Sequence, residues 1–253
     1  MIPSHIVQGA RPQSGADVEW LPNDHILFVM PFKGVYEVNR DKEIVWSYET
    51  RQVSHDADRL PNGNTIIVWG WGERQDVAVR EVDAYGKTVW SWYPKDHLKD
   101  EDIRHTEGGY THTNAVSRLP NGNTLISVRN FDMVVEVDTR GDIIWSLSDV
   151  VERPHDPEVL PNGNILMTSP LNQLTTEVTR DGRVVWRFKQ PRIIRAMRYN
   201  HVLPNGNVLL VGASKIVEIT RAGDVVWELE SKGVDVRSRS QEGWLYKGER
   251  VGR

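Results

Sequence analysis

The sequence predicts an all-β protein, a β-propeller whose blades are four-stranded antiparallel sheets. The first of two repeated phrases that predict it is Leu-Pro-Asn-Gly-Asn, found at 60–64, 119–123, 160–164 and 203–207, with a weaker copy at 21–24. Asn-Gly between two apolar runs favours a two-residue type I′ turn, because both central residues then need a positive φ. Each copy is therefore expected to form the tip of a β-hairpin.

The second phrase predicts another hairpin in every unit. It runs from a Glu to a Trp with alternating apolar and polar residues, at 37–46, 81–90, 136–145, 177–186 and 218–227. A Gly four residues before the Trp supplies the turn, except that Lys42 stands there in the first copy. Two hairpins in a unit of about 42 residues are the spacing of a propeller blade.

Five clear repeats follow one another and predict one propeller domain over residues 1–253. They cover about 16–49, 50–93, 110–149, 150–189 and 190–230. The insertion at 93–109 is rich in Lys, Asp, Glu and His and is typical of a surface loop. A lid over a central site is the alternative, because long loops in compact domains are often functional. His97 and His105 lie in this loop.

The two ends of the chain decide the number of blades. The closing segments 1–15 and 231–253 together are about as long as one blade, and a last blade built from both would leave no open sheet edge. We therefore expect six blade positions, with five blades and a docked basic tail as the alternative. The repeated tryptophans are expected to pack blade against blade rather than bind a ligand. They are Trp46, Trp90, Trp145, Trp186 and Trp227.

Composition argues against several classes of partner and compartment. A formal net charge of −4 and a pI near 6.1 give no basic field of the kind that nucleic acids or anionic membranes attract. The absence of cysteine excludes a disulfide framework and fits a reducing compartment. With neither a signal-like start nor a stretch of 18 apolar residues, we expect a cytoplasmic protein.

The candidate functional residues precede the Leu-Pro-Asn-Gly-Asn turns. On the expected two-residue register, the residues at one end of each hairpin pair as follows: His55 with Gly70, Asn114 with Arg129, His155 with Pro170 and Arg198 with Ala213. The first strand of each blade lines the channel of a propeller, so these side chains would ring one mouth, and His112 shares the face of Asn114. Arg129 adds a fork of donors suited to a tetrahedral anion. The pattern indicates an anion-binding pocket.

Two other interpretations of these residues stay open. In one, the His-Asp pairs are capping devices, the Asp accepting backbone N–H groups and the His satisfying a carbonyl in the next blade. Against it, one place in the repeat is taken in turn by Ala16, His55, Asn114, His155 and Arg198. In the other, three histidines converging on the axis hold a metal, although nearby arginines would repel a cation.

One blade carries a motif that resembles a known family, the arylsulfotransferases, a group of PQQ-like β-propellers. His112-Thr113-Asn114 followed by Ser127-Val128-Arg129 is similar to the family's His-x-Asn and Ser-x-Arg, whose His, Asn and Arg contact the sulfuryl group. The resemblance implies that His155 is the nucleophile that forms a sulfo-histidine and that His55 is a further sulfuryl contact, or the reverse. Arg198 would join in stabilising the developing charge.

The resemblance implies transfer of a sulfuryl group from an aryl sulfate to a phenolic acceptor, with His155, His55, His112 and Arg129 in catalysis. Asn114 and Arg198 would bind the substrate, and neither a metal nor an organic cofactor, PQQ included, would be needed. The secreted members of the family differ in having a signal peptide, a separate N-terminal domain and longer blades. The alternative function is a non-catalytic interaction module or small-anion sensor, with a protein partner on the propeller face.

Overall fold

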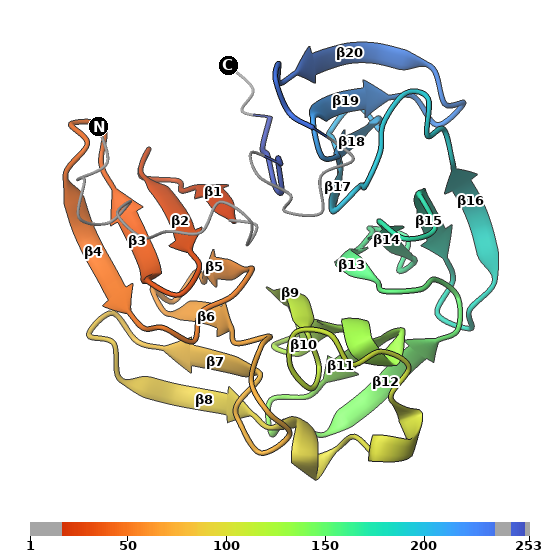
Figure 1. Cartoon of the computed structure of the whole chain (residues 1–253). Helices are drawn as coiled ribbons and strands as arrows, with labels where there is room; N and C mark the ends of the chain where they lie inside the picture. Colours follow the sequence, from red (N-terminus) through yellow and green to blue (C-terminus); the bar gives the residue numbers. More distant parts are fainter. Residues whose placement is uncertain (1–16, 236–243, 251–253) are drawn as a thin grey trace.

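The structure, a computed structural model, describes residues 17–235 and 244–250. These residues form five four-stranded antiparallel sheets that stand around a central axis as the blades of a propeller, with the first strand of each blade nearest the axis (Figure 1). In every blade the strands lie side by side in chain order. This confirms the predicted all-β propeller with four-stranded blades.

The strands follow the repeats along the chain. The first blade contains β1 (Val18–Trp20), β2 (Ile26–Met30), β3 (Gly34–Val38) and β4 (Ile44–Glu49). The second contains β5 (Ala57–Arg59), β6 (Thr65–Val68), β7 (Val79–Val82) and β8 (Thr88–Trp92). The third contains β9 (Thr113–Arg118), β10 (Thr124–Val128), β11 (Met133–Val137) and β12 (Ile143–Ser148). The fourth contains β13 (His155–Val159), β14 (Ile165–Ser169), β15 (Leu174–Val178) and β16 (Val184–Phe188), and the fifth contains β17 (Tyr199–Val202), β18 (Val208–Val211), β19 (Lys215–Ile219) and β20 (Val225–Glu230).

The inner hairpins turn through three residues, so the predicted two-residue type I′ turn is wrong. In the third blade the Leu119 N–H donates to the Asn123 carbonyl at 2.8 Å, the Gly122 N–H donates to the Leu119 carbonyl at 2.9 Å, and Gly122 has a φ of 88°. Asn121 is not among the residues with a positive φ. The reason is Pro120, whose fixed φ near −65° suits the first central position of a type I turn, which a left-handed glycine then closes.

This turn moves every inner strand pair out of the predicted register. In the third blade Val128 pairs with Thr113, whereas Arg129 was predicted to pair with Asn114. In the fourth blade His155 pairs with Thr168, whereas Pro170 was the predicted partner. A bulge near the start of β9 and of β13 adds to the shift. Gly70, the predicted partner of His55, lies against the chain that leads into β9, because a Cβ there would lie 2.2 Å from the Thr113 carbonyl oxygen.

Most of the hydrophobic core lies between neighbouring blades, with smaller clusters inside the first and fifth blades. One cluster joins Ile66 and Trp92 of the second blade to Ile126 and Phe131 of the third, and comparable clusters join the first to the second, the third to the fourth and the fourth to the fifth. Four of the repeated tryptophans pack against these clusters, as expected: Trp46, Trp90, Trp145 and Trp186. Trp227 in the last blade is 38% exposed.

A buried glutamate at one position of each blade ties that blade to the next. In the second blade Glu81 accepts a hydrogen bond from Asn64 at 2.6 Å and pairs with Arg118 of the third blade at 2.5 Å, and Arg118 lies over the Trp90 ring. We call this arrangement the interblade clamp. The other four clamps have Glu37 with Arg59, Glu136 with Arg180, Glu177 with Arg221 and Glu218 with Arg250.

Residues 244–250 of the C-terminal segment close the ring, and the expected six blade positions are wrong for the described chain. This stretch contains no strand; we call it the tail. Arg250 pairs with Glu218 and lies over Trp227, the role that the following blade plays elsewhere. Glu249 accepts the Trp20 N–H of the first blade at 2.7 Å. Seven residues are too few for a sheet, so the five-blade alternative with a docked tail holds; residues 1–15 lie outside the described ranges.

No helix within residues 17–235 and 244–250 combines the length and the apolar character needed to cross a lipid bilayer. Short 3₁₀ turns of three residues each occur at η2 (Pro94–Asp96), η3 (Asp100–Asp102) and η4 (Arg129–Phe131). The first two lie in the loop between the second and third blades, and the third follows β10.

The turns of the β1–β2 and β3–β4 hairpins in the first blade lack the left-handed glycine of the other blades. Asp24 has a φ of 65° and Lys42 a φ of 68° in the positions that Gly63 and Gly86 occupy in the second blade. A left-handed conformation costs a residue with a Cβ about 1–2 kcal/mol, and glycine instead loses about 0.5–1 kcal/mol of chain entropy. The first blade is therefore the most strained in its turns.

We expect Lys42→Gly to raise the free energy of unfolding by about 1 kcal/mol, because it relieves this strain at an exposed site. Urea denaturation measures the change. Lys42→Ala removes the same charge but keeps the Cβ, so it should leave stability nearly unchanged. Gly86→Lys, at the matching position with no neighbouring atom closer than 3.5 Å to an added Cβ, should destabilise by a similar amount. Equal stability for Lys42→Gly and Lys42→Ala would refute the explanation.

Candidate active site

Three histidines from consecutive blades meet at one mouth of the channel. His55 precedes β5, His112 precedes β9 and His155 begins β13. The Nε2 atoms of His55 and His112 are 3.3 Å apart. His55 and His155 are each only 6% exposed. The predicted ring of polar side chains thus exists at the starts of the channel-lining strands.

The aspartate of each His-Asp pair anchors the next blade. Asp56 accepts the Val116 N–H of the third blade at 2.8 Å, and Asp156 accepts the Asn200 N–H of the fifth blade at 3.0 Å. The capping interpretation is therefore right for the aspartates. It is wrong for His155, whose Nδ1 lies 2.8 Å from the carbonyl of Arg153 in its own blade. The two residues of the pair have different roles.

Backbone carbonyls determine which nitrogen of two histidines carries the proton. Nδ1 of His155 faces the Arg153 carbonyl, and Nδ1 of His112 faces the Glu107 carbonyl at 2.7 Å. A carbonyl accepts but cannot donate, and the Arg153 carbonyl lies closer to Nδ1 of His155 than the Asn114 amide nitrogen does at 3.2 Å. Both Nδ1 atoms therefore carry hydrogen, and both Nε2 atoms carry the lone pair. His55 must then donate its Nε2–H to His112. This leaves the lone pair of His55 on Nδ1, a buried atom with no partner among the described residues.

All three histidines are uncharged at neutral pH. Burial lowers the pKa of His55 and of His155 well below the usual value, and nearby positive charge lowers both further. Burial also lowers the pKa of His112 to about 4, with Arg129 acting in the same direction. Neutral imidazoles can act as nucleophiles, which imidazolium ions cannot.

Positive charge at this mouth comes from Arg129 and Arg198. Burial and the neighbouring Arg153 lower the pKa of Arg129 to about 10, so that it stays charged at neutral pH. Arg198 lies over the rings of Trp244 at 4.7 Å and Tyr246 at 6.0 Å. Both arginines act electrostatically on His55 and His155. Two fixed cations beside neutral histidines favour an anion over a metal ion.

The third blade contributes Asn114 and His112 to the site. The Asn114 side-chain amide lies 3.2 Å from Nδ1 of His155, and its backbone N–H donates to Ser127 at 3.3 Å. His112 adopts a φ of 45°, which turns the chain just before β9. All six residues proposed from sequence, His55, His112, Asn114, Arg129, His155 and Arg198, therefore belong to one neighbourhood.

Several neighbours of the site are not evident in the sequence. Trp71 meets the His55 ring edge-on at a centroid distance of 4.7 Å. Glu107, from the loop between the second and third blades, contributes the carbonyl that fixes His112, and its carboxylate pairs with Arg153 at 2.6 Å. The loop therefore forms part of the wall of the site. This contact favours the second of the two expectations for the insertion, a segment over the central site, over a purely solvated loop.

The two histidines of that loop serve its packing. His97 stacks on the buried Trp92 at a centroid distance of 5.5 Å. His105 lies 2.9 Å from Asp132, which follows η4. These contacts hold the loop against the second and third blades. They give neither histidine a place among the three at the channel mouth.

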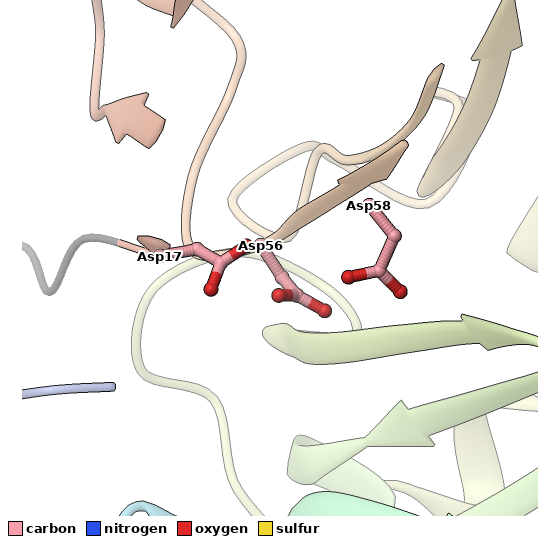
Figure 2. Close-up of side chains that lie close together, drawn as sticks. All are labelled: Asp17, Asp56 and Asp58. Carbon is pink, nitrogen blue, oxygen red and sulfur yellow. The ribbon is translucent and has the colours of Figure 1, made fainter. Parts of the chain in front are cut away.

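Carboxylates surround the channel deeper along its axis. Figure 2 shows Asp17, Asp56 and Asp58 turned toward one another. Their oxygens, unlike the nitrogens of the three histidines, lie close enough to share one ion within the described part of the chain. The Lys247 ammonium already lies among them, 2.7 Å from Asp17 and 3.3 Å from Asp56. The tail thus supplies the counter-cation, and the histidine-metal interpretation gains no support.

A cavity of about 1150 Å³ opens at the turn end of the channel. Its walls are the Leu-Pro steps before the turns, and Asp56, Asp156, Lys247 and Glu249 line it as well. A second void, of about 10 Å³, adjoins this cavity at Lys247 and is bordered by Arg198 and Tyr246. The tail therefore contributes Tyr246 to the histidine end of the channel and Lys247 to its carboxylate end.

Residues 13–152 match the family model described as Arylsulfotransferase (ASST), which is more than half of the chain. The chain belongs to the arylsulfotransferase family. The match includes His55, His112, Asn114 and Arg129 and ends just before His155. No curated protein matches this arylsulfotransferase-family chain significantly.

Solved structures similar to this arylsulfotransferase-family chain are propellers of low sequence identity. A protein of unknown function from Bacteroides caccae has a TM-score of 0.61 and 16% identity, over 80% of this chain and 71% of its own. A streptogramin B lyase has a TM-score of 0.62 and 14% identity, over 87% and 70%. A catalytically inactive virginiamycin B lyase from Staphylococcus aureus with quinupristin has a TM-score of 0.61 and 13% identity, over 87% of this chain and 70% of its own. At these identities the likeness shows the fold alone.

Asp156 should make stability depend on pH. Its burial raises its pKa to about 7 from a usual value of 3.8, so the folded state holds the proton more strongly than the unfolded state does. The stabilisation is complete below the unfolded pKa and is lost as pH rises through about 7. Asp156→Asn keeps an acceptor for the Asn200 N–H and should remain equally stable over this range.

Relative to the wild type, we expect the free energy of unfolding of Asp156→Asn to increase by about 2–3 kcal/mol between pH 5 and pH 8. Urea unfolding at both pH values measures this difference. The exposed substitution Asp142→Asn, measured in parallel, controls for the loss of a carboxylate as such. A constant difference between Asp156→Asn and the wild type at the two pH values would contradict the assignment.

Proposed function

We propose that this protein transfers a sulfuryl group from an aryl sulfate to a phenolic acceptor, with His155 as the nucleophile. The observation that carries the proposal is the Arg153 carbonyl on Nδ1 of His155, which leaves a lone pair on Nε2 of a buried, uncharged imidazole. Membership of the arylsulfotransferase family supports the reaction class. The donor is an anion, and the two arginines at this mouth suit one.

The reaction takes place in two displacements. Nε2 of His155 attacks sulfur, the sulfur–oxygen bond to the aryl group breaks, and the aryl oxide leaves with the electron pair. The oxygen of a phenol then attacks the sulfo-histidine, the nitrogen–sulfur bond breaks with its electrons returning to Nε2, and the phenol proton passes to solvent. Splitting one transfer into two easier ones is the advantage of a covalent intermediate.

The surrounding residues stabilise the charge that develops on the sulfuryl oxygens. Arg129 and Arg198 supply fixed positive charge, and in a site shielded from water such charge is worth more than in bulk solvent. The Asn114 amide adds a neutral contact beside His155. This route needs neither a metal ion nor an organic cofactor, because proton and electron pairs move only between histidine, sulfur and oxygen.

The contacts of His55 favour a supporting role over that of nucleophile. Its Nε2–H is given to His112, and its lone pair lies on the buried Nδ1. A nucleophile must reach its substrate, and this nitrogen is enclosed. His55 also stacks on Tyr246 at a centroid distance of 5.3 Å, so one face of its ring is covered by the tyrosine. We therefore assign the role of nucleophile to His155 and a supporting role to His55.

A small-anion sensor without turnover is the second candidate. The observation that favours it is the presence of Tyr246 beside His55 and His155, where a substrate would need room. In this case the same cations and neutral histidines bind an anion that is released unchanged. The two candidates differ in whether His155 forms a bond to sulfur.

Intact-protein mass spectrometry after incubation with 4-nitrophenyl sulfate tests the transfer. We expect one added SO₃ group, which disappears on addition of phenol and does not form in His155→Ala. Nitrophenol release by that variant should fall by at least about a thousandfold, as expected for loss of a nucleophile. His201→Ala, a half-exposed histidine paired with Glu158 away from the three, is the matched control and should keep the adduct.

An adduct that persists in His155→Ala and disappears in His55→Ala would reverse the two roles. The absence of any adduct, with nitrophenol release no faster than in buffer, would exclude the transfer reaction for aryl sulfates and favour the anion sensor. Melting curves of every variant, recorded in parallel, separate loss of chemistry from loss of fold.

A further inference from the structure

The tail lies between the fifth and first blades (Figure 1). The Leu245 N–H donates to the Ala213 carbonyl at 2.9 Å, and the Leu245 side chain packs on the fifth blade's core cluster. Lys247 reaches the carboxylates, and Arg250 completes the last interblade clamp. Between these anchors, one aromatic side chain enters the histidine end.

That side chain is Tyr246. Its ring lies parallel to the His55 imidazole, with 4° between the planes and 5.3 Å between the centroids. The His155 ring is 6.5 Å away at a tilt of 52°, and the Arg198 guanidinium faces the tyrosine ring at 6.0 Å. A single aromatic ring is thus held between an imidazole and a guanidinium, both of which favour contact with π-faces.

The tyrosine hydroxyl does not explain this placement. Its oxygen is buried and has no hydrogen-bond partner among the described residues. A buried unpaired hydroxyl opposes folding, so the ring is kept in place by its neighbours in the tail rather than by its own polar contact. Successive residues of an extended segment point to opposite sides, which puts Tyr246 at the histidines and Lys247 at the carboxylates.

We propose that Tyr246 fills the place of the substrate's aromatic ring, so that the tail is a built-in competitor for phenols and aryl anions. The proposal rests on the proposed function for the identity of the substrate, but not for the binding itself. The ring of Tyr246 is a phenol, the same chemical class as the proposed acceptor. The ring of Tyr246 already stacks on His55 and faces Arg198, so a second ring can take the same place only after the first has left.

The anchors of the tail make a selective test feasible. Lys247 and Arg250 bind to Asp17 and Glu218, and neither of them contacts the three histidines by hydrogen bond or ion pair in the described structure. Shortening the Tyr246 side chain therefore frees the space that its ring fills beside His55, while Lys247 and Arg250 keep the tail in place. Tyr246→Ala makes the opening, Tyr246→Phe retains the ring without the hydroxyl, and Tyr85→Ala removes a tyrosine that is 94% exposed.

Binding of benzenesulfonate, an aryl anion with no sulfur–oxygen–carbon bond to break, is measured by titration calorimetry. We expect Tyr246→Ala to bind it at least about tenfold more tightly than the wild type, and Tyr246→Phe and Tyr85→Ala to match the wild type. Phenol should raise the melting temperature of Tyr246→Ala and leave that of the other proteins unchanged. If Tyr246→Ala does not fold, Tyr246→Leu, which leaves a smaller opening, should show both effects at reduced size.

Equal or weaker benzenesulfonate binding by Tyr246→Ala and Tyr246→Leu would overturn the proposal and make Tyr246 a structural or substrate-binding residue. Turnover of 4-nitrophenyl sulfate separates this result from failure of the proposed function. If no variant releases nitrophenol but Tyr246→Ala gains aryl binding, the competitor role stands and the transfer reaction is excluded. If the wild type releases nitrophenol and Tyr246→Ala has an unchanged KM, the competitor role is excluded and the transfer reaction stands.

Discussion

The interblade clamp is the interaction on which the rest of the molecule depends. Each clamp places a carboxylate in the interior, where an unpaired charge would be very costly. An arginine from the next blade, or from the tail in the case of the fifth blade, neutralises it. A blade in the wrong place would leave Glu81 or its equivalents buried without a partner. The clamp therefore specifies which surface each blade presents to its neighbour, and this brings the strand starts with their histidines together around one axis.

The site arises where the repeat is broken. Each channel-lining strand offers the same position to the mouth, yet the side chains that fill it differ in charge and size from blade to blade. Neutral His55 and His155 alternate with Asn114 and charged Arg198, while Asp17, Asp56 and Asp58 gather deeper in the channel. The axis therefore runs from a positive mouth to a negative interior. Such a gradient attracts an anion to the histidines and opposes its passage beyond them.

Much of this arrangement could be predicted from sequence because it is periodic or local. The two repeated phrases specified the blades, and the His-x-Asn and Ser-x-Arg motif identified one wall of the site. The turn type was mispredicted because a proline before Asn-Gly changes the turn that this pair otherwise favours. The predicted number of blades was wrong for a different reason. Arg250 takes the place of an arginine that the next blade supplies elsewhere, and no sequence periodicity marks Arg250. Tyr246 and Glu107 could not be predicted because contacts between distant segments leave no local pattern.

The way in which the ring is closed also sets the order in which the molecule can be completed. Proteins emerge from the ribosome from the N-terminus, and compact units form as they appear. All five blades precede residues 244–250, so each can dock on its predecessor while Glu218 and Asp17 still lack the cations of the tail. The nascent propeller is consequently an open arc with an accessible histidine mouth. Among the described residues, Tyr246, Lys247 and Arg250 then convert that arc into a closed ring, and residues 244–250 are where it would first come apart.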